Sequence, residues 1–150
     1  MEEGLGIQRR IHPERHSMEG KFLLFIGKAL RLQDKYDEAL AMAKQAFRIF
    51  RKTAGPESSS VCDALSCISS VLRAQGKHDK AIEKYGKALA ILRQVHGNEH
   101  QDVANALTNM AEYKEAAGDV QGAMECVKEA VGIYTSKGIS HRSAQRSAEL

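Results

Sequence analysis

The chain has 150 residues, of which 43% are hydrophobic and 27% charged, as in ordinary folded proteins. The formal net charge of +3 is too small to indicate nucleic acid or a membrane surface as a partner. Apolar runs such as Phe22–Ile26 are far too short for a membrane span, and the charged residues near Met1 do not fit a signal peptide. Three cysteines without a CxxC pair suit a reducing compartment. We therefore expect a cytoplasmic or nuclear protein and place it in the cytoplasm.

In chain order, residues 1–19 show no strong period. We expect an N-terminal tail there, disordered or frayed, unless the segment is the remnant of an earlier linker. Residues 20–140 then hold three similar copies, at about 20–58, 59–100 and 101–140. Apolar residues spaced by three and four predict two helices in each copy. The six predicted helices cover residues 20–33, 37–52, 60–75, 79–95, 101–117 and 121–135.

The copies repeat with a period of 42 residues. A fixed period in this range predicts stacked copies of one supersecondary unit, each burying its apolar face against its neighbours. Both prolines, Pro13 and Pro56, lie outside the periodic apolar stretches, so the copies can be helical throughout. The residues that return are Leu23, Leu65 and Leu107; Ile26, Ile68 and Met110; Ala39, Ala81 and Ala123; Ala46, Ala88 and Ala130; and Ile49, Ile91 and Ile133.

Small residues in register set the expected packing. The alanines of the second helix of each copy lie two turns apart on one face, where a methyl side chain lets the partner helix come close. The turn within a copy is short, which predicts antiparallel neighbours. HEAT repeats share the period range but do not require this register of alanines. In the last predicted helix, the expected apolar stripe comprises Ala123, Met124, Val127, Ala130 and Val131.

The end of the sequence repeats the linker pattern once more. Gly138 and His141 have the same spacing as Gly97 and His100. We therefore expect residues 141–150 to be either the start of a fourth copy or a polar helix that caps the stack.

These positions resemble the tetratricopeptide repeat. That family places a small residue late in the first helix, Gly and an aromatic residue before the second, and two alanines within it. The matching residues here are Leu23, Gly27, Tyr36, Ala39 and Ala46; Leu65, Ser69, Gly76, His78, Ala81, Tyr85 and Ala88; and Leu107, Ala111, Gly118, Ala123 and Ala130. The resemblance implies an all-α, right-handed superhelical solenoid of antiparallel helix pairs, with three full repeats and a partial or capping fourth.

The length of the copies indicates a subclass. Tetratricopeptide repeats usually have about 34 residues, whereas the copies here have 42. The linker pattern is similar to that of kinesin light chain and related long-repeat proteins. It is carried by Gly97, His100, Val103, Ala104, Leu107, Asn109, Met110 and Ala111. The chain has no heptad run, so it does not match a complete light chain.

The resemblance also implies a binding surface, because the first helices of successive repeats line a concave groove in this family. The matching amide in light chains bonds the backbone of an extended peptide, which implies that role for Asn109. The predicted groove residues are Lys21, Leu24, Phe25, Lys28 and Arg31; Asp63, Ser66, Cys67, Ser70 and Arg73; and Asn105, Thr108, Asn109, Glu112 and Glu115. Because the first two copies contribute positive charge, we expect a peptide with acidic residues toward the first copy.

The sequence gives little support for a catalytic or cofactor-binding site. We find no phosphate loop, nucleophile elbow or kinase signature, and we expect no catalytic site, cofactor or metal. His96 and His100 flank Gly97 and Asn98, which indicates a loop rather than a helical metal-ligand pair. The cysteines, Cys62, Cys67 and Cys126, are interpreted as small buried or groove residues.

The leading hypothesis is a non-enzymatic protein-interaction scaffold that binds a peptide or a partner helix in its groove. Two alternatives stay open. The chain could be a self-associating module whose open ends pair, since three copies are near the minimum for stability. It could also be a regulatory segment of a larger multidomain protein. Nucleic acid and membranes are not expected as partners.

Overall fold

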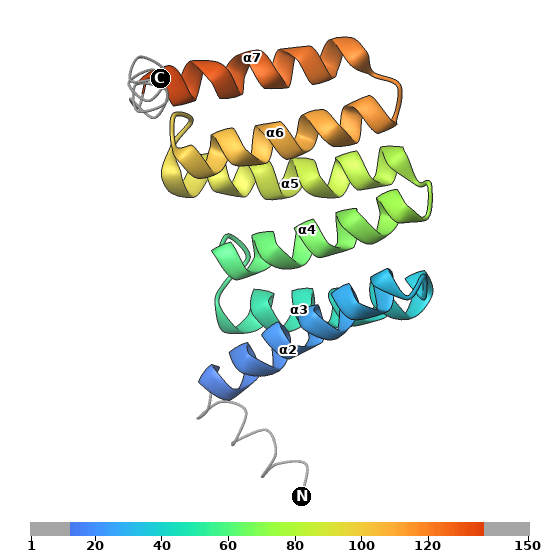
Figure 1. Ribbon diagram of the computed structural model, residues 1–150. Coiled ribbons are helices and arrows are strands. Elements are labelled where there is room, and N and C mark those ends of the chain that lie inside the picture. The colour runs from blue at the N-terminus through green and yellow to red at the C-terminus, as the bar shows by residue number, and fades with distance from the viewer. Residues whose placement is uncertain (1–12, 137–150) are drawn as a thin grey trace, which may run out of the picture. The chain divides into compact units, whose positions relative to one another are not determined.

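The computed structural model describes residues 13–136, and this part of the chain forms six α-helices and no strand (Figure 1). The prediction of an all-α chain is confirmed, and five of the six helices begin and end within about two residues of the predicted bounds. No described helix combines the length and apolar character needed to cross a membrane. The helices are α2 (Pro13–Leu32), α3 (Tyr36–Thr53), α4 (Ser59–Ala74), α5 (His78–His96), α6 (Gln101–Ala116) and α7 (Val120–Ser136).

The helices belong to two compact units, which divide between Lys77 and His78. The first unit holds α2, α3 and α4, and the second holds α5, α6 and α7. The division falls inside the second predicted copy, between its two helices, rather than between copies.

The helix α2 differs from its prediction, because it begins at Pro13 rather than at residue 20. The expectation of a tail that reaches residue 19 is wrong for residues 13–19. Proline suits the first position of a helix, since its φ is fixed near the helical value and it has no N–H to leave unpaired. The predicted tail at residues 1–12 and the predicted fourth copy or cap at 141–150 lie outside the described residues.

In the first unit, α3 packs against both α2 and α4. Its core side consists of Ala39, Ala43, Ala46 and Phe50, all buried, so the predicted alanine register is confirmed there. Two glycines let α2 lie close to α3. A Cβ on Gly20 would fall 2.6 Å from the ring of Phe50, and one on Gly27 would fall 3.3 Å from the Ala39 carbonyl oxygen.

In the second unit, α6 packs against α5 on one side and α7 on the other. The rings of Tyr85 in α5 and Tyr113 in α6 lie with centroids 5.0 Å apart, tilted by 32°. Aromatic pairs favour such offset arrangements. Ala123 and Ala130 of α7 are buried, which again confirms the predicted register of small residues.

The turns that follow α2, α4 and α6 share one geometry. In each, a backbone N–H after the turn bonds to a carbonyl five residues earlier, as in Lys35 to Leu30 at 2.9 Å and Asp119 to Lys114 at 2.8 Å. This closure requires a residue with positive φ. Gly118 has φ 87° there, whereas Asp34 takes the same place after α2 with φ 61°. Aspartate is one of the few residues that tolerate this region.

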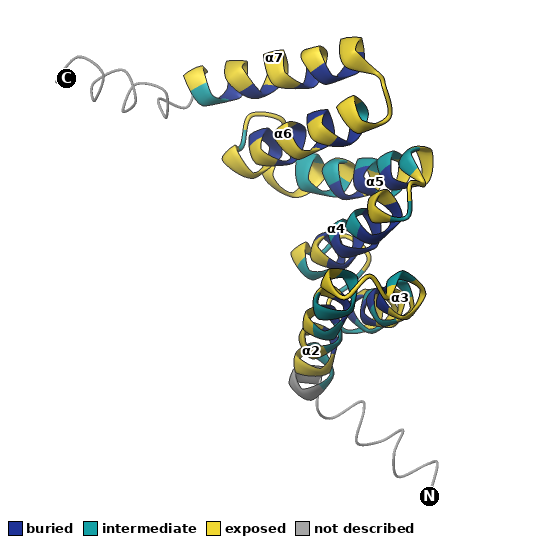
Figure 2. Ribbon diagram, turned by 45° about the vertical axis from the view of Figure 1, so that its right-hand side comes forward, coloured by how far each residue is buried: buried dark blue, intermediate teal, exposed yellow. Residues whose placement is uncertain are grey.

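The predicted apolar stripe of α7 is correct on one side and wrong on the other. Ala123, Ala130 and the cysteine between them are buried, but Met124, Val127 and Val131 are exposed. In Figure 2 the side of α7 toward α6 is buried and the opposite side is exposed. The prediction failed because the repeat gives this helix two apolar sides, and α6 covers one of them.

Candidate interaction site

A groove between α2 and α4 gathers most of the predicted binding residues of the first unit. The groove is open to solvent and has a volume of about 610 Å³. Helical spacing explains the lining, because residues three, four and seven apart lie on one side of each helix. We call this feature the α2–α4 groove. Its lining consists of Lys21, Leu24, Phe25, Lys28 and Arg31 from α2 and Asp63, Ser66, Cys67 and Ser70 from α4.

Cationic and apolar groups share the α2 side of this groove. Lys21 and Lys28 are exposed two helical turns apart, and Arg31 follows at the end of the helix. Phe25, which lies between the two lysines in the sequence, is exposed, whereas Leu24 is buried. A ligand in the groove would therefore meet both positive charge and apolar surface on the α2 side.

The α4 side contributes a carboxylate, two hydroxyls and a thiol. Desolvation raises the pKa of the Asp63 carboxyl, and the charges of Lys28 and Lys21 act in the opposite direction. Desolvation likewise raises the pKa of the Cys67 thiol, again opposed by Lys28 and by Arg31. Cys67 is buried, so it lines the groove as a small neutral side chain. The groove combines three cations with one acidic group.

Arg73 was predicted to face this groove, but it is not among the residues that line it. It lies in the last turn of α4, where its side chain is exposed. A basic residue in this position also faces the negative end of the helix dipole. It lies three residues beyond Ser70, the last lining residue of α4.

The remaining predicted residues lie on α6 in the second unit. Asn105, Asn109 and Glu112 are exposed. The side-chain amide of Asn109 donates a hydrogen bond of 3.0 Å to the hydroxyl of Tyr85, and the hydroxyl of Tyr134 donates to the amide oxygen of Asn105. The two tyrosines orient these amides, a role that sequence reasoning missed. Tyr85 stands in the family pattern, so its position gave a usable signal.

The two histidines of the α5–α6 loop lie together, and an acidic residue joins them. The rings of His96 and His100 are stacked with centroids 4.2 Å apart. An oxygen of Asp102 lies 3.3 Å from Nε2 of His96 and 3.7 Å from Nδ1 of His100. These three side chains are of the kinds that bind transition metals. Sequence reasoning considered the histidines and missed Asp102.

A hydrogen bond within this cluster gives His100 a structural role. Nδ1 of His100 accepts a hydrogen bond of 3.0 Å from the backbone N–H of Asp102, so His100 caps the start of α6. The four first N–H groups of a helix need such partners. A metal bound at this nitrogen would displace the cap, and the geometry therefore favours a structural role for the loop.

Comparison with protein families gives two matches. A family model described as tetratricopeptide repeat matches residues 60–136, which is just over half of the chain. A second model with the same description matches residues 23–60. None of the curated proteins compared with the chain matches it.

Several solved structures have a similar fold. BtubC (BKLC) from P. vanneervenii has a TM-score of 0.72 at 21% identity, over 79% of this chain and 48% of that one. TPR-like repeats of a Podosopora anserina protein described as a kinesin light chain have a TM-score of 0.68 at 22% identity, over 84% and 58%. The TPR domain of Arabidopsis FLU has a TM-score of 0.67 at 19% identity, over 81% and 98%. The chain thus spans about half the length of the first two structures.

Proposed function

The chain belongs to the tetratricopeptide repeat family, and from that premise we propose that it is a non-enzymatic scaffold that binds an acidic peptide or partner helix in the α2–α4 groove. The fold is all-α and tetratricopeptide-like, with long copies similar to those of kinesin-light-chain structures. Repeats of this family generally mediate contacts between proteins. Our proposal adds the surface and the chemistry of the partner.

The observation that carries the proposal is the composition of the groove. Lys21, Lys28, Arg31 and the exposed Phe25 line the groove together with the buried Leu24 and Cys67. An aromatic anchor with charged groups around it is typical of surfaces that bind other proteins. A peptide with one apolar side chain between acidic residues would place the apolar group on Phe25 and its carboxylates near the three cations.

The distribution of charge also gives the peptide a preferred placement. The three cations lie on α2, whereas Asp63 lies on the α4 side of the groove. Acidic side chains of the peptide are therefore expected along α2, and neutral or hydroxyl-bearing side chains along Ser66 and Ser70 of α4. Such complementarity acts mainly on specificity and on the association rate. The expected partner is a protein segment in the cytoplasm, with no cofactor involved.

Binding of labelled peptide pools tests the proposal. One fluorescein-labelled pool carries Asp and Glu around a central apolar residue, and the other carries Lys and Arg at the same places. Fluorescence anisotropy should show binding of the acidic pool that weakens as salt rises, because the charges are screened. The double variant Lys28→Glu with Arg31→Glu should lose roughly tenfold or more in affinity, which corresponds to about 1.4 kcal/mol.

The matched control reverses the same two charges elsewhere. Lys44 and Arg48 are exposed on α3 and do not line the groove, so the double variant Lys44→Glu with Arg48→Glu should bind like the wild type. Equal losses in both double variants would show a response to net charge alone. Preference for the basic pool would contradict the proposal outright.

A further inference from the structure

The first and the last described helices, α2 and α7, each have an apolar side that no other described helix covers. On α2, Met18 and Phe22 are exposed, and Phe22 retains 67% of its accessible surface. On α7, Met124, Val127 and Val131 are exposed, and Val127 retains 45%. The spacings of three and four place each set on a single side of its helix. Large apolar side chains gathered on one exposed side mark an interaction surface.

The contact between α5 and α6 in the second unit shows what covers such a side. Tyr85 of α5 is only 5% exposed, because it packs against Tyr113 and receives the hydrogen bond from Asn109. A Cβ on Gly86 would lie 3.7 Å from Met110, so this glycine also faces α6. The second helix of one copy thus buries this side against the first helix of the next copy.

The exposed side of α7 is the counterpart of that side of α5. Counting 42 residues onward, Val127 corresponds to Tyr85 and Lys128 to Gly86. Met124 and Val131 correspond to Ile82 and Leu89, which are partly covered in α5. The side of α7 that a following first helix would bury is therefore the side that is exposed.

The exposed side of α2 is, in the same way, the counterpart of the α5-facing side of α6. Phe22 corresponds to Ala64 in α4 and to Ala106 in α6, which are 0% and 3% exposed. Ala29 lies two helical turns beyond Phe22, and it corresponds to Tyr113, the residue that packs on Tyr85. The first helix of the first copy thus has the surface that its equivalents bury against a preceding second helix.

From these two surfaces we infer that the chain self-associates end to end, with α7 of one copy packed against α2 of a second copy. The contact would repeat the α5–α6 contact, with side-chain sizes exchanged. Val127 is smaller than its equivalent Tyr85, and Phe22 is larger than its equivalent Ala106. Exchanged sizes keep the total volume of the contact similar, which close packing requires.

Charge favours this pairing over pairing of like ends. The helix α2 contains four basic and two acidic residues, whereas α7 contains one basic and two acidic residues. Two α2 helices would bring like charges together, while α2 and α7 carry opposite net charges. The contact joins two different surfaces, so it is heterologous, and each copy keeps one surface available for a further copy.

Sedimentation equilibrium of the full chain over a range of concentrations tests the inference. The wild type should rise in average mass above the 16.5 kDa of one chain as concentration increases. Phe22→Glu and Val127→Glu should each remain at the mass of one chain, because every contact needs both surfaces. Val95→Glu replaces another exposed valine, on α5, and should associate like the wild type. Circular dichroism checks that the helix content of each variant is unchanged.

A mixture of the two variants gives the decisive result. Phe22→Glu keeps an intact α7 surface and Val127→Glu keeps an intact α2 surface, so the mixture should form pairs of about 33 kDa and stop there, twice the mass of one chain. A wild type that stays at one chain mass would overturn the inference, leaving residues 137–150 or another protein as the cover of α7. Association that survives in either single variant would overturn it too, because like ends would then be pairing.

Discussion

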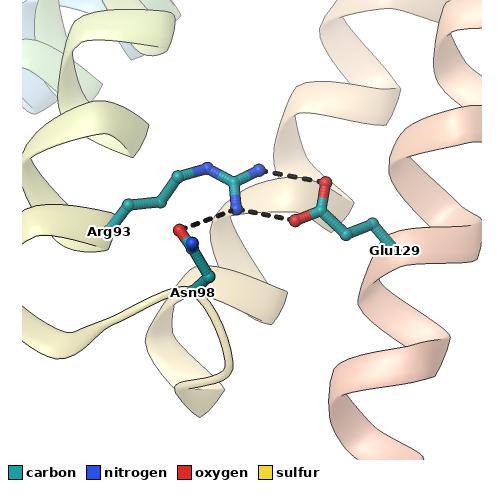
Figure 3. A network of polar contacts seen from close by, with 3 residues as sticks. All are labelled: Arg93, Asn98 and Glu129. Carbon is teal, nitrogen blue, oxygen red and sulfur yellow. Dashed lines mark hydrogen bonds and ion pairs between the residues drawn. The ribbon is translucent and has the colours of Figure 1, made fainter.

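Arg93 of α5 and Glu129 of α7 form a two-bonded ion pair across the second unit. The guanidinium donates to the two carboxylate oxygens at 2.6 and 3.0 Å (Figure 3). The same guanidinium nitrogen that makes the shorter bond also lies 3.4 Å from the amide oxygen of Asn98 in the loop after α5. Arg93 thus connects α5 to α7, which are not consecutive in the chain, and also contacts the loop between α5 and α6. The paired geometry makes this contact stronger than a single-bonded surface pair.

Glu129→Gln should lower the free energy of unfolding at neutral pH by about 0.5–1 kcal/mol, a value reduced because both side chains are partly exposed to solvent. The hydrogen bond from Arg93 lowers the pKa of Glu129 in the folded chain below its ordinary 4.5. The contribution is therefore complete above pH 4.5 and is lost as pH falls through the lower folded value. Urea unfolding of both chains from pH 7 to pH 3 should show the difference shrinking on acidification. Glu125→Gln on the same helix serves as the control, and a difference that grows in acid would refute the assignment.

Gly20→Ala should destabilise the first unit. The new methyl group would meet the ring of Phe50 at 2.6 Å, and Phe50 is buried and closely packed. Overpacking of this kind costs about 1–3 kcal/mol, more than the roughly 1 kcal/mol that alanine gains over glycine in a helix. Gly132→Ala in α7 is the matched control, because beyond its own stretch of helix backbone nothing lies within 4 Å of the added methyl group. Thermal unfolding should show opposite shifts, with the control stabilised; a stabilised Gly20→Ala would mean that α2 does not approach Phe50 this closely.

The cysteines should resist alkylation in the folded chain. All three are buried, and desolvation raises the pKa of Cys62 from its ordinary 9.0 to about 11, with Asp63 acting in the same direction. A rise of this size lowers the reactive thiolate fraction roughly a hundredfold at neutral pH. Mass spectrometry after iodoacetamide should find the native chain unmodified and the urea-unfolded chain modified three times. Because the folded pKa is raised, the associated stability holds below pH 9 and declines as pH rises toward 11. Rapid labelling of native Cys62 would contradict this account.

The positions of the helices followed from the sequence because one period is repeated three times. The alanines at 39 and 46 could be assigned to the core from their equivalents at 123 and 130, and all four are buried. The start of α2 could not be found in this way, since residues 13–19 have no counterpart with the same pattern. Contact with α3, visible at Gly20 and Phe50, gives this helix its packing near its start.

The lining of the α2–α4 groove followed from the resemblance to the tetratricopeptide repeat, which implies that the first helices of successive repeats line a groove, and helical spacing then selected the positions. Side-chain contacts between helices were harder to predict from the sequence. The bond from Asn109 to Tyr85 and the approach of Asp102 to His96 depend on how two helices meet, which the period alone does not specify. The exposed side of α7 was assigned to the core for a related reason. The period identifies equivalent positions in the three copies, but whether such a position is buried depends on which helix packs against it.

The packing of Tyr85 against Tyr113 has a practical consequence for measurements on this molecule. The chain contains no tryptophan, and all four phenylalanines lie in the first unit, between residues 22 and 50. Three of the four tyrosines, including this pair, lie in the second unit. In near-ultraviolet spectra the benzyl bands therefore come from the first unit alone, whereas the phenol bands come mainly from the second unit, with Tyr36 as the one contribution from the first.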